Sequence, residues 1–246
     1  MKVIGGYVSP YVRKVLACLH LKGLDYEIDP ITPFYGDAEF ERVSPLRRIP
    51  VLIDGAVELC DSSVICAYLD EAYPGHPLLP QAPADRARAR WLEEYADTRM
   101  GDVFIWRLFQ NAVIKPAVWG EKGDKAVIAA ALETDVPGVL DYLERQVPAQ
   151  GYLFGELLGL ADISLGAFFR NAGFARFSVD AGRWPKTATF VGRVLNHPAL
   201  RMLQPYEDVC MTTPIAGHRD ALRAAGAPIT AETVATATPK PGVMPI

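Results

Sequence analysis

The chain has 246 residues, 50% of them hydrophobic, and carries a net charge of −4 at pH 7. This length predicts one large or two small domains, and the negative balance argues against nucleic acid or an anionic membrane surface as a general partner. No apolar run reaches the ~18–20 residues that span a bilayer, and no signal peptide is evident. The four cysteines show no zinc-like spacing. We therefore expect a cytoplasmic protein without a metal site.

The first part of the chain alternates between strand and helix patterns. Short apolar runs predict strands at residues 3–4, 26–28, 49–53 and 56–59. The last two strands flank Asp54-Gly55, a favourable hairpin turn. Helices are predicted from residue 11 to residue 21, ending at Lys22-Gly23, and from Asp61 onward, where apolar residues recur three or four apart. This order of elements is typical of a small α/β domain.

Four prolines between residues 74 and 83 indicate a linker, and the pattern beyond it is helical. Apolar periodicity predicts helices at residues 84–104, 125–131, 136–145, 160–174, 187–195 and 199–203. After Tyr206 the chain is rich in Ala, Thr and Pro, with a short helix compatible with residues 218–225. The final stretch is either disordered or a strap laid over the surface. The expected boundaries are 1–76 for the first domain, 77–85 for the linker, 86–206 for the helical domain and 207–246 for the tail.

Ser9-Pro10-Tyr11-Val12 occupies the junction between the first strand and the first helix. Serine is favoured as an N-cap, and proline is favoured at the first helical position. The unpaired N–H groups and the positive end of the helix dipole would stabilise a thiolate held above this turn. An ordinary N-cap would also explain the serine when it is considered alone.

Two further segments have both a structural and a functional interpretation. Ile49-Pro50 is either a plain strand start or a cis peptide that turns the backbone of Ile49 toward a peptide-like ligand. Asp61-Ser62 is either another N-cap or a carboxylate site at a helix N-terminus. Together with Ser9, these segments describe a thiolate position, a docking edge for extended backbone and a carboxylate pocket. That combination suits a small thiol peptide.

Four stretches of the chain resemble cytosolic glutathione S-transferases of the serine type, as in bacterial, theta, zeta and tau proteins. They are SPYVRKV at 9–15, SPLRRIPVL at 44–52, DSSVICAYL at 61–69, and LFGE at 153–156 leading into LADISL at 160–165. The resemblance covers residues 1 to about 205. It implies an α+β two-domain fold, in which a thioredoxin-like β-α-β-α-β-β-α domain precedes an all-α helical domain.

The resemblance implies a role for each matching residue. Ser9 would be the catalytic residue that donates its hydroxyl to the glutathione sulfur. The backbone of Ile49, before a cis Pro50, would pair with the cysteinyl unit, and Asp61 and Ser62 would hold the γ-glutamyl group. Arg48 stands where the family often has lysine. It would meet the glycyl carboxylate of glutathione, or it is a solvated surface charge.

Glutaredoxin-like relatives carry Cys-Pro-Tyr-Cys at this junction, and here Ser9 and Val12 replace both cysteines. A serine cannot form the mixed disulfide of thiol–disulfide exchange, so thiol activation is expected rather than reductase chemistry. Some classes of the family use a tyrosine at the end of the first strand. Tyr7 is therefore the alternative thiol-activating residue, with a place in the acceptor pocket or in the core as its other options.

The helical domain departs from the family pattern at one capping position. Gly159 stands where Ser or Thr usually caps a helix, so only the Asp162 half of the capping box is expected to form. This departure concerns the stability of the helix rather than catalysis. Its cost is small because glycine is a tolerable N-cap.

The resemblance implies a glutathione transferase that uses glutathione as co-substrate and attacks a small hydrophobic electrophile. The electrophile pocket would be lined by Val8, Tyr11, Phe104 and Arg107. Ether cleavage, dehalogenation and isomerisation use the same thiolate and stay open as alternatives. A non-catalytic scaffold with this fold is a further alternative. The family also implies a homodimer that joins the first domain of one chain to the helical domain of the other.

Overall fold

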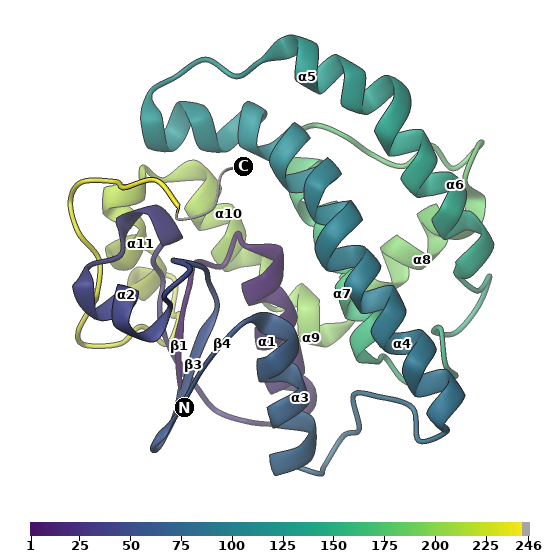
Figure 1. The fold of residues 1–246 in the computed structure, drawn as a ribbon, viewed down its shortest axis with the longest axis horizontal. Helices are drawn as coiled ribbons and strands as arrows, with labels where there is room; N and C mark the ends of the chain where they lie inside the picture. Colours follow the sequence, from purple (N-terminus) through teal and green to yellow (C-terminus); the bar gives the residue numbers. More distant parts are fainter. Residues whose placement is uncertain (243–246) are drawn as a thin grey trace. The chain divides into compact units, whose positions relative to one another are not determined.

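The computed structural model describes residues 1–242 as two compact units (Figure 1). The first unit combines Met1–His76 with the segment that begins at Met202, and the second is Pro77–Arg201. The chain therefore returns to its first unit after completing the second. Residues 202–206, which the sequence analysis assigned to the helical domain, group with the first unit.

A four-stranded mixed sheet forms the centre of the first unit. In spatial order its strands are β2 (Glu27–Asp29), β1 (Lys2–Ile4), β3 (Val51–Asp54) and β4 (Val57–Cys60). β2 runs parallel to β1, whereas β3 is antiparallel to both of its neighbours. Gly55 adopts a φ of 60° in the turn between β3 and β4, which confirms the predicted hairpin.

Helices cover both faces of this sheet. The helices of this unit are α1 (Pro10–Leu21), η1 (Pro33–Tyr35), α2 (Ala38–Val43), α3 (Ser62–Ala72), α10 (Gln204–Thr212), η4 (Ile215–Gly217) and α11 (His218–Ala224). α1 and α3 lie side by side on one face, and α2 lies on the other (Figure 1). The side chain of Ser9 caps α1 and that of Asp61 caps α3, as their residue types predict.

The C-terminal segment forms a strap along the edge strand β2. The N–H of Ile28 donates to the carbonyl of Pro228 at 2.8 Å, and the N–H of Thr230 donates to the carbonyl of Ile28 at 3.1 Å. Val234 is buried in the same apolar cluster as Phe40. The strap thus covers the edge of the sheet, which would otherwise present unpaired backbone groups. The end of the predicted tail, residues 243–246, lies outside the described residues.

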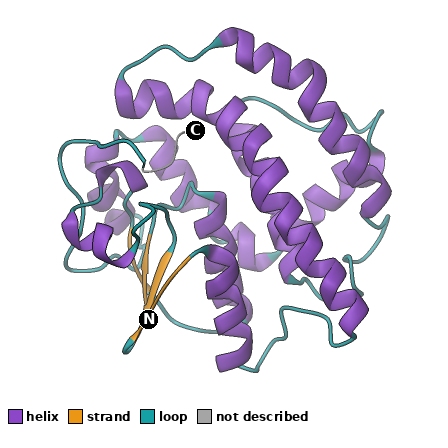
Figure 2. Ribbon diagram, viewed as in Figure 1, coloured by secondary structure: helices purple, strands orange, loops and turns teal. Residues whose placement is uncertain are grey.

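The second unit consists of helices and loops (Figure 2). Its elements are α4 (Pro83–Tyr95), η2 (Ala96–Trp119), α5 (Lys125–Ala130), η3 (Ala131–Asp135), α6 (Val136–Gln146), α7 (Leu160–Phe174), α8 (Pro185–Asn196) and α9 (Pro198–Arg201). η2 continues directly from α4 and winds as a π-helix that ends at Gly120, where φ is 67°. α7 is the central helix: most of its residues are buried, and it packs against α4, η2 and α8.

Asp162 connects the first turn of α7 to the loop that precedes it. The carboxylate of Asp162 accepts the N–H of Gly159 at 3.0 Å and the N–H of Leu153 at 2.8 Å. The Asp162 half of the capping box therefore forms, as the sequence predicts. Across residues 1–242, we find no helix that is long and apolar enough to cross a membrane.

Candidate functional site

The register of the sheet brings three of the predicted site segments to one end of the first unit. Val51 of β3 pairs with Ile4 of β1 on one side and with Cys60 of β4 on the other. The segments that adjoin these three residues therefore emerge at the same end of the sheet. They are residues 5–9, 49–50 and 61–62.

Contacts around the first turn of α1 agree with this grouping. A Cβ atom added to Gly5 would lie 3.1 Å from Cβ of Ile49 and 2.5 Å from a methyl group of Val12. On the other side of α1, Nζ of Lys14 donates to Oγ of Ser63 at 3.2 Å. The first turn of α1 and the Ile49 segment thus both lie beside Gly5, and Lys14 of α1 contacts the start of α3.

Ser9 is the N-cap of α1 and is partly exposed. Its Oγ accepts the N–H of Val12 at 3.4 Å, which leaves the hydroxyl proton available to another acceptor. The positive end of the α1 dipole lies at the same place. An anion above this turn would therefore meet a hydroxyl donor and a favourable dipole together.

The Ile49–Pro50 peptide bond is cis, as the resemblance implied. Ile49 precedes β3 and is partly buried. Within the described residues, neither its N–H nor its carbonyl takes part in a backbone hydrogen bond. This segment therefore presents one free donor and one free acceptor of the kind that an extended peptide pairs with.

Asp61 has the unusual backbone angles φ 78° and ψ 128°, which non-glycine residues rarely adopt. Its carboxylate accepts the N–H groups of Ser63 (2.9 Å) and Val64 (3.3 Å), which stabilise this conformation. Ser62 is buried at the first position of α3. Strained backbone that surrounding contacts hold in place is common at ligand sites.

The two neighbouring arginines have different roles. Arg48 is exposed, and its backbone is held by Oγ of Ser44, which accepts its N–H at 2.9 Å. Arg47 is buried at a positive φ of 50° and contacts the carboxylate of Glu41 and the carbonyl of Gly36. Arg47 is therefore structural, whereas Arg48 is an exposed residue of the same segment.

Tyr7 lies in the interior of the first unit with only 1% of its surface exposed. Its ring packs against that of Tyr206, with the centroids 5.0 Å apart. Burial raises the pKa of its hydroxyl well above the ordinary value, with the nearby Tyr26 adding to the shift. Of the options left open for Tyr7, this position matches core packing.

The residues expected to line an electrophile pocket are divided between the units. Val8 and Tyr11 are partly exposed beside Ser9. Phe104, by contrast, is fully buried in the second unit, 5.1 Å from the ring of Phe169. Aromatic residues at helical spacing commonly pack inside helical domains in this way, and a place for Phe104 in the electrophile pocket stays a prediction. Arg107 forms ion pairs with Asp102 and Asp135.

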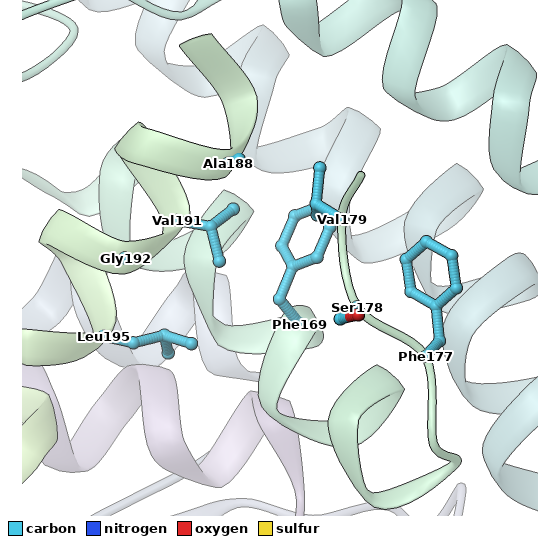
Figure 3. Close-up of a pocket in the computed structure, with 8 residues that line it drawn as sticks. All are labelled: Phe169, Phe177, Ser178, Val179, Ala188, Val191, Gly192 and Leu195. Carbon is cyan, nitrogen blue, oxygen red and sulfur yellow. The ribbon is translucent and has the colours of Figure 1, made fainter. Parts of the chain in front are cut away.

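A hollow of about 250 Å³ lies in the second unit between the end of α7 and α8 (Figure 3). Its lining is mostly apolar and consists of Phe169, Phe177, Ser178, Val179, Ala188, Val191, Gly192 and Leu195. Neither Phe104 nor Arg107 contributes to it. Among the described residues, no three His, Cys, Asp or Glu side chains are grouped so that they could hold a metal ion.

A buried ion pair behind the Ser9 turn was not predicted from the sequence. Nε of Arg13 in α1 donates to Oε1 of Glu207 in α10 at 2.5 Å, and both side chains are 1% exposed. The partners are 194 residues apart in the chain. The local signal was the pair of basic residues Arg13 and Lys14 on a mostly apolar helix, and such residues are normally assigned to the solvent face.

Comparison with known proteins agrees with this architecture. Residues 3–77 match the family model of the glutathione S-transferase N-terminal domain, and residues 105–198 match that of the C-terminal domain. Glutathione S-transferase U6 of Arabidopsis thaliana is 28% identical over 175 residues, which are 68% of this chain and 69% of that protein. The chain belongs to the glutathione S-transferase family.

Two solved structures illustrate the likeness in three dimensions. A glutathione S-transferase from Rhodospirillum rubrum F11 has a TM-score of 0.78 at 26% identity, covering 89% of this chain and 98% of that one. A maleylacetoacetate isomerase from Methylobacterium extorquens AM1, solved with bound malonate and GSH, has a TM-score of 0.69 at 25% identity. That alignment covers 84% of this chain and 97% of that one.

Proposed function

We propose that this chain is a glutathione transferase that binds glutathione at the sheet end described above and activates its thiol through Ser9. The observation that carries the proposal is the Ser9 hydroxyl, which accepts from Val12 and keeps its own proton for an acceptor at the positive end of α1. Lowering a thiol pKa by one unit requires about 1.4 kcal/mol. One charge-assisted hydrogen bond can supply that amount.

Other groups at this end of the sheet would bind the rest of the glutathione molecule. The unpaired N–H and carbonyl of Ile49 would form two hydrogen bonds with the cysteinyl backbone. The Ser62 hydroxyl and the N-terminus of α3 would hold the γ-glutamyl carboxylate, with Asp61 close to its amino group. Arg48 is exposed at the same segment and would meet the glycyl carboxylate.

The reaction follows from these positions. The glutathione thiol releases its proton to water, and the thiolate accepts the Ser9 hydroxyl proton as a hydrogen bond. The sulfur then attacks a carbon of a small hydrophobic electrophile and forms the C–S bond. In a substitution the leaving group departs with the electron pair of the bond that breaks, and in an addition the π bond of that carbon breaks and its electron pair moves to the neighbouring atom, which takes up a proton from water. Val8 and Tyr11 are the partly exposed neighbours that would contact this electrophile.

A glutathione-dependent isomerisation is the second candidate. Two of the similar structures, at 25% identity each, are named maleyl pyruvate isomerase and maleylacetoacetate isomerase. Such a reaction would begin with the same thiolate and differ in releasing glutathione after rearrangement of the adduct. A panel of electrophiles and cis-dienoic acids distinguishes the two, because only conjugation consumes glutathione.

The test of glutathione binding is titration calorimetry together with retention on immobilised glutathione. We expect saturable binding and specific elution by free glutathione. A chain that flows through the resin and gives no heat at millimolar glutathione would be a scaffold rather than an enzyme.

We also propose that the chain forms a homodimer. Large apolar side chains are exposed in each unit, including Val64 of α3 and Trp91 of α4, which is 55% exposed. Burial of such residues is a common driving force for association. Light scattering should give twice the chain mass, and a monomer mass at micromolar concentration would contradict the proposal.

A further inference from the structure

Two consecutive residues of α10 reach the turn that carries Ser9. The ring of Tyr206 packs on that of Tyr7, with the centroids 5.0 Å apart, and the carboxylate of Glu207 binds Arg13. Tyr7 lies two residues before Ser9, and Arg13 lies four residues after it. The C-terminal segment thus contacts the turn from both ends.

The guanidinium of Arg13 connects this segment to the turn itself. Its Nε donates to Glu207 at 2.5 Å, while its Nη2 lies 3.4 Å from the carbonyl oxygen of Val8. That carbonyl belongs to the peptide group whose nitrogen is the N–H of Ser9. Because the guanidinium is planar and rigid, its orientation toward Glu207 also fixes its position beside the Val8 carbonyl.

A buried ion pair contributes little net stability compared with apolar packing of the same shape. The pair instead fixes the positions of the two side chains, because each charge has few positions in which it is compensated. Cys210 lies near enough to Glu207 for the carboxylate to add to the rise in the pKa of its thiol. Burial raises the pKa of the Cys210 thiol to about 12, and it raises the pKa values of Tyr7 and Tyr26 above their ordinary values.

We propose that Arg13 and Glu207 are positioning residues, which hold the Val8–Ser9 peptide so that the Ser9 hydroxyl is directed at the glutathione sulfur. This inference rests on the proposed function. It assigns to α10 of the C-terminal segment a part in thiol activation without contact with the substrate.

The sign of the pKa shift separates positioning from a charge effect of Glu207, and hydrogen exchange separates it from a charge effect of Arg13. If Glu207 acted through its negative charge, its removal would stabilise the thiolate and lower the pKa of the bound thiol. If it acts by holding Arg13, loss of the pair loosens the Ser9 turn and raises that pKa. Glu207→Gln retains an oxygen that can accept from Nε of Arg13, and it therefore removes the charge while leaving the contact in place.

The experiment compares the wild-type chain with Glu207→Gln and with the double variant Arg13→Met/Glu207→Leu, which replaces the pair by apolar packing so that the fold is retained. Thiolate absorbance of bound glutathione against pH gives the thiol pKa. We expect the double variant to raise it by about half a unit, which is about a threefold loss of thiolate at a fixed pH below the pKa. Glu207→Gln should leave the pKa unchanged or lower it.

Amide hydrogen exchange without glutathione tests the positioning directly. The double variant should exchange about threefold faster in residues 8–13. Lys22→Met/Asp70→Leu is the matched control, because it removes the ion pair at the opposite end of α1. It should leave both the exchange of residues 8–13 and the thiol pKa unchanged.

The outcomes separate the two proposals. Unchanged exchange at residues 8–13 in the double variant would overturn the positioning proposal whether or not glutathione binds, as would a lower thiol pKa in both Glu207 variants. A wild-type chain that leaves the thiol pKa of glutathione at its free value would instead overturn the proposed function.

Discussion

Asp29 and Arg219 meet across 190 residues of chain: Nη1 of Arg219 donates to Oδ1 of Asp29 at 2.7 Å. Asp29 ends β2 and is fully buried, and Arg219 belongs to α11. The same carboxylate also accepts the Thr233 hydroxyl and the Val234 N–H, each at 2.8 Å. One aspartate therefore fastens both α11 and the strap to the edge of the sheet.

Loss of Arg219 should destabilise the first unit. Arg219→Met leaves the Asp29 carboxylate buried without its ion-pair partner, and we expect a loss of about 2–4 kcal/mol in the free energy of unfolding by urea. The matched control on the same helix is Arg223→Met, which breaks an exposed pair with Asp220 and should cost less than about 1 kcal/mol. Equal effects of the two substitutions would show that the strap is not anchored through Asp29.

Ser9→Ala should raise the pKa of the bound glutathione thiol by about one unit, because it removes the hydroxyl donor. Tyr7→Phe should leave that pKa nearly unchanged, since the Tyr7 hydroxyl is buried in the core. Thiolate absorbance against pH measures both. Ser9→Gly serves as a control for helix capping, because glycine caps almost as well as serine and also lacks the hydroxyl. A larger effect of Tyr7→Phe would transfer the catalytic role to Tyr7.

Asp162 should make stability depend on pH. Burial raises the pKa of its carboxyl from 3.8 to about 6, although the N–H groups of Leu153 and Gly159 partly offset the shift. Because the folded pKa exceeds the unfolded one, this contribution to stability is complete below about pH 4 and is lost as the pH rises through about 6. Two pKa units correspond to about 3 kcal/mol.

The measurement is the difference in unfolding free energy between the wild-type chain and Asp162→Asn, taken from urea titrations at several pH values. This difference should shift against the wild type by about 3 kcal/mol between pH 4 and pH 7. The other carboxyl groups affect the unfolding free energy of both chains equally, so their effects cancel in this difference. A constant difference would mean that Asp162 titrates normally.

Gly192 and Gly166 offer a test of packing in the second unit. Gly192 lies within α8 at the hollow between α7 and α8 (Figure 3), and a Cβ atom there would have no neighbour within 4 Å. Gly192→Ala should therefore stabilise the chain by about 1 kcal/mol through its better helix propensity. A Cβ atom at Gly166 of α7 would lie 2.4 Å from a methyl group of Val194, so Gly166→Ala should destabilise it. Thermal unfolding should show opposite shifts of the midpoint.

Local chemistry made most of the elements predictable. The helix predicted at residues 160–174 coincides with α7, and the helices capped by Ser9 and Asp61 begin where those residues indicate. The hairpin of β3 and β4 could be predicted because Asp54-Gly55 is a favourable turn between two apolar runs. α10 was not predicted, because its sequence mixes proline, acidic residues and apolar residues without a clear periodicity.

The parts of the site that escaped prediction depend on contacts distant in sequence. Ser9, Ile49-Pro50 and Asp61-Ser62 carry their own local signals, and the strand register explains why they adjoin one another. Nothing near Arg13 indicates that its partner is Glu207. The composition of the strap likewise does not indicate that Val234 is buried, because its burial depends on β2 and Phe40. Such pairings follow from tertiary packing rather than from propensity.

The discontinuity of the first unit has a consequence for the order of events on the ribosome. Pro77–Arg201 is contiguous and can complete its contacts as soon as it has emerged. The sheet that would bind glutathione is synthesised first, yet it must wait for Glu207, Arg219 and the strap before its interior ion pairs and its open edge are closed. During that interval the nascent chain exposes β2 to other polypeptides. We expect this to be the stage at which expression of the protein is most sensitive to aggregation.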